Sequence, residues 1–163
     1  MKTNMLNLFI VDDNPLMVLG LRGYLESRFG TDLTISTFSS GAAALQKVDG
    51  DTNIVILDYF LEGESGNDVL RSIKKINPKT EVIMLSSNED MGVAISAFRN
   101  GATDYVVKDA KSWKKITSII YGIITYPLRI MVREFGINKY IAMFLLTFAA
   151  MGIGVFLAIK LTN

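Results

Sequence analysis

Short apolar segments alternate with amphipathic segments along the first 125 residues of the chain. The run Ile54–Leu57 is continuously apolar, as in a strand buried on both faces, whereas Leu33–Phe38 alternates apolar residues with Ser and Thr, as in a half-buried strand. Five segments have the composition and length of β-strands: Leu6–Val11, Leu33–Phe38, Ile54–Leu57, Glu81–Leu85 and Tyr105–Val107.

A segment with helical periodicity follows each predicted strand. In the first, Asn14 can act as N-cap, Pro15 suits the first turn and Gly30 ends the helix. Its apolar positions are Leu16, Leu19, Tyr24 and Leu25. Helices are expected at Pro15–Arg28, Gly41–Val48, Asn67–Ile76, Asp90–Asn100 and from Ser112, where the buried stripe is Ile116, Ile119, Ile120, Ile123 and Ile124. The connections are short, with Gly63–Gly66 as a turn, so the order predicts an α/β fold: a (βα)5 doubly wound, five-stranded parallel sheet.

The segment Tyr140–Ile159 is a run of twenty residues without a charge. At about 1.5 Å per residue, a helix of this length spans roughly 30 Å, the hydrocarbon thickness of a bilayer. A helix buried in a core or an oligomer is the alternative, but so small a domain has no room to bury a helix that is apolar all round. We therefore expect a domain over residues 1–126 and a C-terminal transmembrane helix over residues 140–160.

The basic residues around this segment predict its orientation. Three of them precede it (Arg129, Arg133 and Lys139) and only Lys160 follows it, so the positive-inside rule places the N-terminal side in the cytoplasm. The first apolar run is too short for the core of a signal peptide. We expect a single-pass protein of the bacterial inner (cytoplasmic) membrane whose N-terminal domain faces the cytoplasm.

Residues 127–139 join the two parts and are predicted to form an amphipathic juxtamembrane linker. Four apolar residues recur there at helical spacing beside two arginines, which suits a helix lying on membrane lipid: Leu128, Met131, Val132 and Phe135. A simple continuation of the preceding helix is the alternative, and the pattern does not choose between them. Within the span, Ala150, Gly154 and Ala158 form a ridge of small residues that could let two copies pack as a homodimer.

Charge and composition narrow the chemistry. Residues Met1–Ala110 hold ten Lys/Arg and fifteen Asp/Glu, a balance of −5, whereas Lys111–Asn163 hold seven and one, a balance of +6. The chain has no cysteine and no histidine, which excludes a disulfide framework, a thiolate nucleophile, Ser-His-Asp catalysis and the usual zinc sites. Any phosphohistidine donor is therefore expected on another chain.

Polar residues follow four of the predicted strands. The pair Asp12-Asp13 follows the first strand, Asp58 the third, Ser86 the fourth and Lys108 the fifth. The carboxyl ends of parallel strands share one edge of the sheet, which is where α/β proteins place their sites. Clustered carboxylates repel one another unless a cation holds them, so the arrangement points to Mg²⁺ and phosphate chemistry.

Four motifs in order resemble the receiver domain of two-component response regulators, over about the first 125 residues. They are FIVDDNP (Phe9–Pro15), IVILDYFLEGESG (Ile54–Gly66), VIMLSS (Val82–Ser87) and DYVVK (Asp104–Lys108). The resemblance implies a flavodoxin-like fold. It also implies that Asp58 accepts a phosphoryl group from a histidine kinase or a phosphotransfer protein.

The resemblance assigns a metal site to the carboxylates. Asp13 and Asp58 would ligate Mg²⁺ directly, together with the backbone carbonyl of Phe60. Asp12 would act mainly through bound water.

The same resemblance assigns the remaining roles. Lys108 would pair with the phosphoryl oxygens, and Ser86 would hydrogen-bond the phosphoryl group once it arrives. Tyr105 would swing inward when Ser86 moves.

The sequence departs from the family pattern at four positions. Asp109 follows Lys108 where the family often has proline, and Glu62 stands where proline is common; the first puts the rigidity of that loop in doubt. Phe60 is large and apolar and offers no hydrogen bond to a hydrolytic water, and Asn88 lacks the charge of a carboxylate, so we expect slow self-dephosphorylation.

The function expected from the sequence is a membrane-anchored response regulator receiver that signals through protein contacts. No DNA-binding domain fits after Lys108, so no nucleic-acid partner is expected, and the only reactions catalysed would be the chain's own phosphorylation and dephosphorylation. One alternative is a phosphorylation-independent pseudo-receiver scaffold that recruits partners to the membrane. Another is an enzyme with an aspartyl nucleophile on the same architecture, although the short loops show no substrate pocket.

Overall fold

The computed structural model describes the backbone of residues 6–134 and 139–162. Side chains are described within these ranges except at 126–134, 139–140, 142 and 154–162. The chain divides into two compact units, Met1–Ile119 and Ile120–Asn163.

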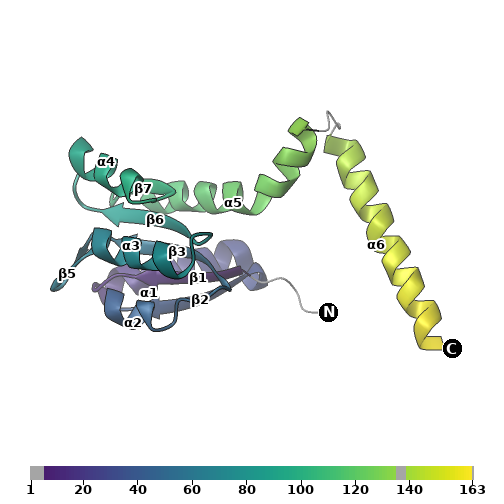
Figure 1. The fold of residues 1–163 in the computed structure, drawn as a ribbon, viewed down its shortest axis with the longest axis horizontal. Helices are drawn as coiled ribbons and strands as arrows, with labels where there is room; N and C mark the ends of the chain where they lie inside the picture. Colours follow the sequence, from purple (N-terminus) through teal and green to yellow (C-terminus); the bar gives the residue numbers. More distant parts are fainter. Residues whose placement is uncertain (1–5, 135–138, 163) are drawn as a thin grey trace. The chain divides into compact units, whose positions relative to one another are not determined.

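The first unit is built on a five-stranded sheet in the order β2-β1-β3-β6-β7, in which every neighbouring pair is parallel (Figure 1). The strands are β1 (Leu6–Val11), β2 (Leu33–Phe38), β3 (Thr52–Asp58), β6 (Glu81–Ser86) and β7 (Asp104–Val107). All five predicted strands are confirmed. The central strand β3 is buried along almost its whole length, as its continuous apolar run requires.

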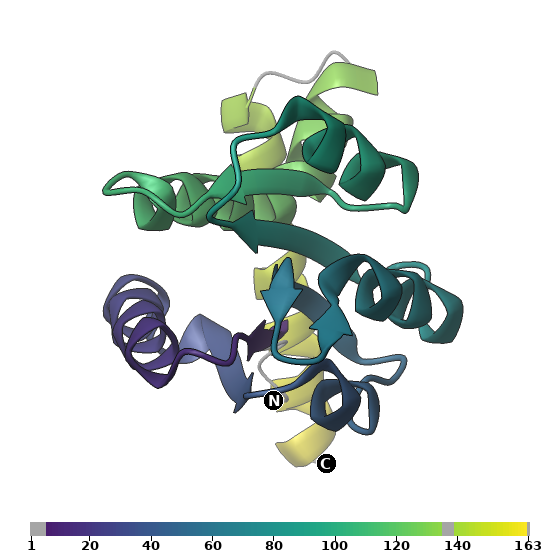
Figure 2. The ribbon, with the colours of Figure 1, turned by 90° about the vertical axis from the view of Figure 1, so that its left-hand side faces the viewer.

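Helices cover both faces of this sheet, as a doubly wound fold requires. The helices are α1 (Pro15–Phe29), α2 (Gly41–Leu45), α3 (Gly66–Ile76), α4 (Met91–Arg99) and α5 (Ser112–Glu134), with a short 3-10 turn η1 (Gly30–Asp32) after α1. Figure 2 shows α1 and α5 on one face and α2, α3 and α4 on the other. The predicted flavodoxin-like (βα)5 arrangement is therefore confirmed.

Helix α1 begins and ends as its sequence predicts, but it buries a different face. The Asn14 side chain accepts hydrogen bonds from the first-turn amides, and Gly30 ends the helix with φ +53°, a conformation that favours glycine. The predicted apolar positions Leu16 and Leu19 are 79% and 70% exposed. The buried face is formed by Leu21, Leu25 and Phe29, one turn apart along the helix.

Two further expectations are corrected. Helix α2 ends at Leu45 and not at Val48. The segment expected as a simple turn lies within a small antiparallel hairpin, β4 (Phe60–Leu61) and β5 (Glu64–Ser65), in which Gly63 adopts φ +73°. Such two-residue strands are too short to leave a periodic signal in the sequence.

The second unit contains the rest of α5 and helix α6 (Lys139–Thr162). The backbone of α5 continues through Pro127 to Glu134, so the first part of the predicted linker continues the preceding helix. The linker's apolar face, together with Gly154 and Ala158, lies outside the described side chains. Among the residues that the structure describes, no helix is long and apolar enough to cross a membrane, so the transmembrane span stays a prediction.

Candidate functional site

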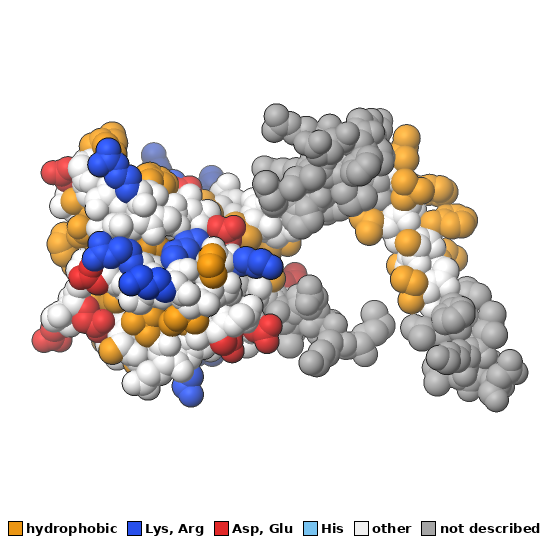
Figure 3. All heavy atoms as spheres, in the orientation of Figure 1, with side chains coloured by type: hydrophobic (Ala, Val, Ile, Leu, Met, Phe, Trp, Pro, Cys, Tyr) orange, Lys and Arg blue, Asp and Glu red, His pale blue; other side chains and the backbone are white. Residues whose placement is uncertain are grey.

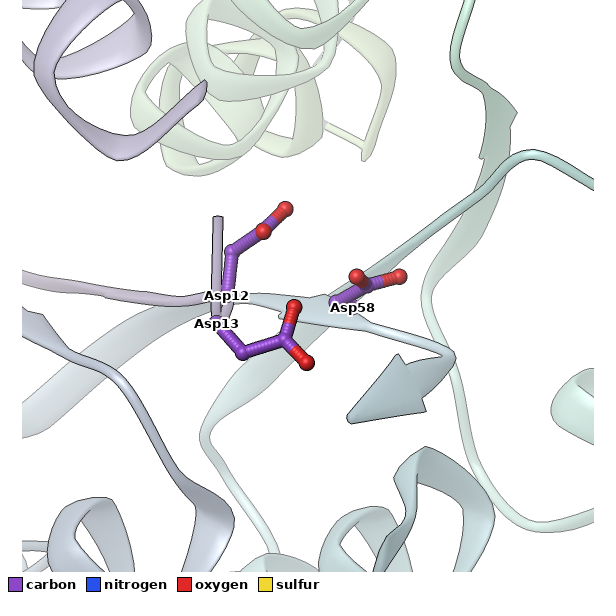
Figure 4. A group of neighbouring side chains, drawn as sticks. All are labelled: Asp12, Asp13 and Asp58. Atoms are coloured by element: carbon purple, nitrogen blue, oxygen red, sulfur yellow. The ribbon is translucent and has the colours of Figure 1, made fainter. Parts of the chain in front are cut away.

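Three carboxylates meet at the carboxyl edge of the sheet (Figure 4). Asp12 and Asp13 directly follow β1, and Asp58 ends β3, the strand that pairs with β1. Their ligand atoms all lie within 4.8 Å of one another. Asp12 and Asp58 are buried, with 2% and 4% of their surface exposed, whereas Asp13 is open to solvent. The predicted juxtaposition of the three acids is confirmed.

A single lysine bridges the two buried carboxylates. The Lys108 Nζ donates to Asp12 Oδ2 at 2.8 Å and to Asp58 Oδ2 at 2.7 Å. Lys108 follows the edge strand β7, and its backbone N–H donates to the carbonyl of Ser86 at 2.7 Å. Segments at the ends of β1, β3, β6 and β7 therefore supply one site, as the sheet order predicts.

Burial and neighbouring charges have opposite effects on the pKa values of Asp58 and Lys108. Burial raises the pKa of Asp58, and the neighbouring Asp12 charge adds to this, while Lys108 and the Phe60 amide oppose it. For Lys108, burial acts to lower the pKa, but its hydrogen bonds to Asp12 and Asp58 outweigh that effect and the pKa is raised. The ammonium therefore stays charged and holds both carboxylates in place.

The donor set fits a hard divalent cation. Three carboxylates and one ammonium leave an excess of negative charge, and two like charges 4.8 Å apart repel by roughly 3.5 kcal/mol at an effective dielectric constant of about 20. Among the described residues, no ion pair engages Asp13; its Oδ2 accepts only the backbone N–H of Glu62, at 2.9 Å. Carboxylate oxygens are the ligands that Mg²⁺ prefers.

Backbone contacts fix the position of Asp58. The Tyr59 N–H donates to the Leu85 carbonyl at 2.8 Å, and the Gly66 N–H donates to the Tyr59 carbonyl at 2.9 Å. A Cβ at Gly66 would lie 2.4 Å from the Asp58 carbonyl oxygen, so only glycine allows this approach. The sequence predicted a turn ending at Gly66 but missed its role in seating Asp58.

Ser86 and Tyr105 meet at the backbone of Asn88. The Ser86 Oγ accepts the Asn88 N–H at 3.0 Å, and the Tyr105 hydroxyl donates to the Asn88 carbonyl at 2.7 Å. Both side chains are buried, at 0% and 7% exposed. The sequence shows only that Asn88 carries no charge; its backbone contacts to these two side chains leave no sequence signal.

The loop after Lys108 is ordered without proline. The Asp109 Oδ1 accepts the Lys111 N–H at 2.8 Å, and its carbonyl accepts the Ser112 N–H at 3.2 Å and the Ser112 hydroxyl at 2.8 Å. These bonds close a turn at the start of α5. The expected loss of rigidity at Asp109 is therefore offset by side-chain and backbone hydrogen bonds.

Phe60 lies at the rim of the site. It is 51% exposed and packs edge-on against Tyr59, with ring centroids 4.7 Å apart. Its backbone N–H donates to Asp58 Oδ1 at 3.2 Å. Its side chain brings no hydrogen-bonding group to the acceptor.

Comparison with known proteins agrees with this geometry. The family model for the response regulator receiver domain matches residues 8–120. The DNA-binding transcriptional regulator NtrC of Escherichia coli K12 is 34% identical over 102 residues, which are 61% of this chain and 21% of that protein. The nitrate/nitrite response regulator NarP of the same strain is 29% identical over 102 residues, covering 62% of this chain and 47% of that protein.

Solved structures give the same fold. The BeF3-activated DrrB receiver domain matches with a TM-score of 0.64 at 25% identity, over 74% of this chain and 97% of that one. A Burkholderia pseudomallei response regulator with a phosphorylated aspartic acid and a calcium ion matches in fold, with a TM-score of 0.63 at 19% identity over 76% of this chain and 71% of that one. The chain spans about a fifth to a half of the length of the curated relatives above.

Proposed function

Because the chain belongs to the response regulator receiver family, we propose that it accepts a phosphoryl group on Asp58 from the phosphohistidine of a histidine kinase or a phosphotransfer protein. The observation that carries this proposal is the Lys108 ammonium, which bridges Asp12 and Asp58 beside a third carboxylate. A structural salt bridge needs only one acid, and the additional like charges disfavour a purely structural role.

Asp58 is the nucleophile. One of its carboxylate oxygens attacks phosphorus, the P–N bond to the donor imidazole breaks, and the imidazole nitrogen leaves with the electron pair. The product is an acyl phosphate on Asp58. The ionised form is required, and Lys108 and the Phe60 N–H oppose the effect of burial on the Asp58 pKa.

Lys108 supplies positive charge next to the new group. Its Nζ already contacts Asp58 Oδ2 at 2.7 Å, so a phosphoryl group on Asp58 forms within its reach. The ammonium then exchanges a carboxylate contact for phosphoryl oxygens, which requires little movement. Asp12 keeps its own hydrogen bond from the Asn14 N–H at 2.9 Å.

The metal site of this proposal uses Asp13 and Asp58 with the Phe60 carbonyl, while Asp12 acts through water. When bound, Mg²⁺ neutralises charge on the phosphoryl oxygens. Asp13 is exposed and would give the ion access from solvent, and the buried Asp58, which is itself the acceptor, would hold the ion next to the phosphoryl group.

Phosphoryl uptake by the purified chain tests this function. Incubation with acetyl phosphate and Mg²⁺ should add one phosphoryl group by mass, and Asp58→Asn should abolish the addition. Asp51→Asn, at an exposed acid in the loop before β3, is the matched control and should keep it. A folded chain that takes up no phosphoryl group would instead favour the phosphorylation-independent scaffold.

We also propose that α6 anchors the chain in the bacterial inner membrane, with the receiver domain in the cytoplasm. Two observations support this proposal. Helix α6 contains a run of twenty uncharged residues, and its described large apolar side chains are exposed. Contact of such apolar surface with water is unfavourable. The chain should stay with membranes after carbonate extraction, and a chain ending at residue 126 should not. Recovery of the full chain in the soluble fraction would refute the anchor.

In this proposal the output passes through protein contacts and not through DNA, although NtrC is a DNA-binding regulator. The receiver would recruit or release a partner next to the membrane. Comparing co-purifying proteins for the wild type and Asp58→Asn tests this, and identical sets would contradict a phosphorylation-dependent output.

A further inference from the structure

Charge is unevenly distributed over the first unit. Residues Met1–Ala110 carry a balance of −5, and the acidic site lies at the carboxyl edge of the sheet. Basic side chains nevertheless gather over α3 on the face shown in Figure 3. Four basic residues lie in the last turns of α3 and α4 and in the loop after α3, and we call them the basic cluster: Lys74, Lys75, Lys79 and Arg99.

Two contacts place Lys74 among these residues. The Lys74 Nζ donates to the carbonyl of Thr80, the residue after Lys79, at 2.6 Å. A Cβ at Gly101 would lie 3.4 Å from the Lys74 side chain, so the end of α3 meets the loop that follows Arg99. Glu81 lies within electrostatic reach of Lys74, and the loop that carries Asp49 also borders the cluster, since the Asp49 carbonyl accepts a hydrogen bond from the Asn77 side-chain amide at 3.1 Å. The other three basic residues of the cluster are exposed.

Two large apolar side chains accompany the cluster. Ile76, at the end of α3, is 49% exposed, and Phe98, next to Arg99, is 50% exposed. Exposed lysine and arginine together with exposed Ile and Phe are the side chains that bind an anionic lipid surface: the cations pair with headgroups and the apolar groups enter the interface.

The topology places the cluster at the edge of the sheet where the strands begin. Helices of βα units run antiparallel to their strands, so the ends of α3 and α4 lie at the edge opposite the carboxylates. Helix α5 starts after β7 at the carboxyl edge and runs in the same sense. The part of α5 that belongs to the first unit therefore runs toward the edge that carries the basic cluster.

We propose that the basic cluster docks the receiver domain on anionic lipid headgroups of the membrane that holds α6. The inference rests on the proposed anchor. Docking through this edge leaves the acidic site facing away from the lipid, where a phosphoryl donor can reach Asp58.

The absence of cysteine allows a direct test with one introduced label. Pro78→Cys places an environment-sensitive fluorophore beside the cluster, and Glu89→Cys places it in the exposed loop after β6 as the control. The full chain is incorporated into vesicles of phosphatidylcholine, alone or mixed with phosphatidylglycerol. The label at position 78 should shift to the blue only in the anionic vesicles, and the label at 89 should not shift.

Neutralising the cluster gives the second arm. Lys75→Gln, Lys79→Gln and Arg99→Gln together should remove most of the shift; Lys74 is kept because it bonds to Thr80. Lys111→Gln with Lys114→Gln, at two exposed lysines by the start of α5 at the carboxyl edge, should leave the shift unchanged. Added salt should reduce it, because headgroup attraction is screened.

The outcomes separate docking from anchoring. If the chain floats with both vesicle types but the fluorescence of the label at position 78 does not depend on lipid charge, docking is overturned while the anchor stands. The same result is expected if the cluster binds an acidic protein instead. Flotation only with anionic vesicles, lost in the triple variant, supports docking and refutes the anchor. Failure to float with either vesicle type overturns both.

Discussion

Replacing Lys108 with methionine should destabilise the receiver domain most strongly near neutral pH. The change keeps much of the apolar stem but removes the ammonium that contacts Asp12 at 2.8 Å and Asp58 at 2.7 Å. Both carboxylates are almost fully buried, so they lose their compensating charge in a poorly solvated place.

Removing one partner of a buried ion pair costs about 3–5 kcal/mol. Because the Lys108 side chain is 22% exposed, solvent screens part of the repulsion and we expect about 3 kcal/mol, the lower end of that range. The loss should shrink on acidification, since burial raises the folded-state pKa of Asp58 and its carboxyl becomes neutral as the pH falls through that pKa. It should also shrink in alkali. The raised pKa of Lys108 means that its contribution is present below the unfolded value, about 10.4, and is lost as the pH rises through the folded value.

Urea unfolding of the fragment 1–126, followed by Trp113 fluorescence without divalent cations, measures this difference. Trp113 packs against Tyr24 in the first unit, with ring centroids 5.4 Å apart, and so reports its unfolding. Lys111→Met, at an exposed lysine, is the matched control and should change stability little. Mg²⁺ should stabilise Lys108→Met more than wild type, because the variant site carries more negative charge. A loss below about 1 kcal/mol, the range of surface ion pairs, or a loss independent of pH, would refute the reasoning.

Three further changes test other parts of the site. Asp58→Asn should raise the urea midpoint at neutral pH and lose this advantage in acid, because burial raises the Asp58 pKa and an acid with a raised folded-state pKa destabilises the fold as pH rises through that pKa; an equal effect at every pH would contradict this. Gly66→Ala should cost about 1–3 kcal/mol and slow phosphoryl uptake, since its Cβ would meet the Asp58 carbonyl at 2.4 Å, whereas Gly23→Ala, with nothing within 4 Å, should be neutral or stabilising. Phe60→Asn should shorten the phosphoryl lifetime several-fold in a decay assay by offering a polar group to the attacking water, and an unchanged lifetime would remove Phe60 from the account.

Much of the fold could be predicted because its signals are local. Strands β1 and β2 match the expected bounds residue for residue, since continuous or alternating apolar runs end at polar residues. The Asn14 cap and Gly30 also act within one turn of the helix they limit. The prediction that Leu16 and Leu19 lie on the buried face of α1 was wrong, because periodicity identifies an apolar residue without showing whether a partner element covers it.

The site was predictable in its members but not in its contacts. Parallel strand order is enough to bring Asp12, Asp58 and Lys108 to one edge. Lys108 donates two hydrogen bonds, one to Asp12 and one to Asp58. The backbone of Asn88 accepts a hydrogen bond from Tyr105 and donates one to Ser86. These contacts depend on atomic positions that residue types alone do not specify. The same holds for contacts between helices. Asn67 on α3 is buried, and its Nδ2 donates to Ser96 on α4 at 3.1 Å.

The sequence separations within the site have a consequence for quality control. Lys108 lies 96 positions from Asp12 and 50 from Asp58, so the three groups meet only when the sheet has assembled. In an unfolded chain, Asp58 is an ordinary solvated carboxylate with neither ammonium nor neighbouring acid beside it. In the proposed reaction, acyl phosphate formation is thereby restricted to copies with an intact fold. On that proposal the phosphorylated fraction of a population contains only correctly folded molecules, and misfolded copies contribute nothing to the signal.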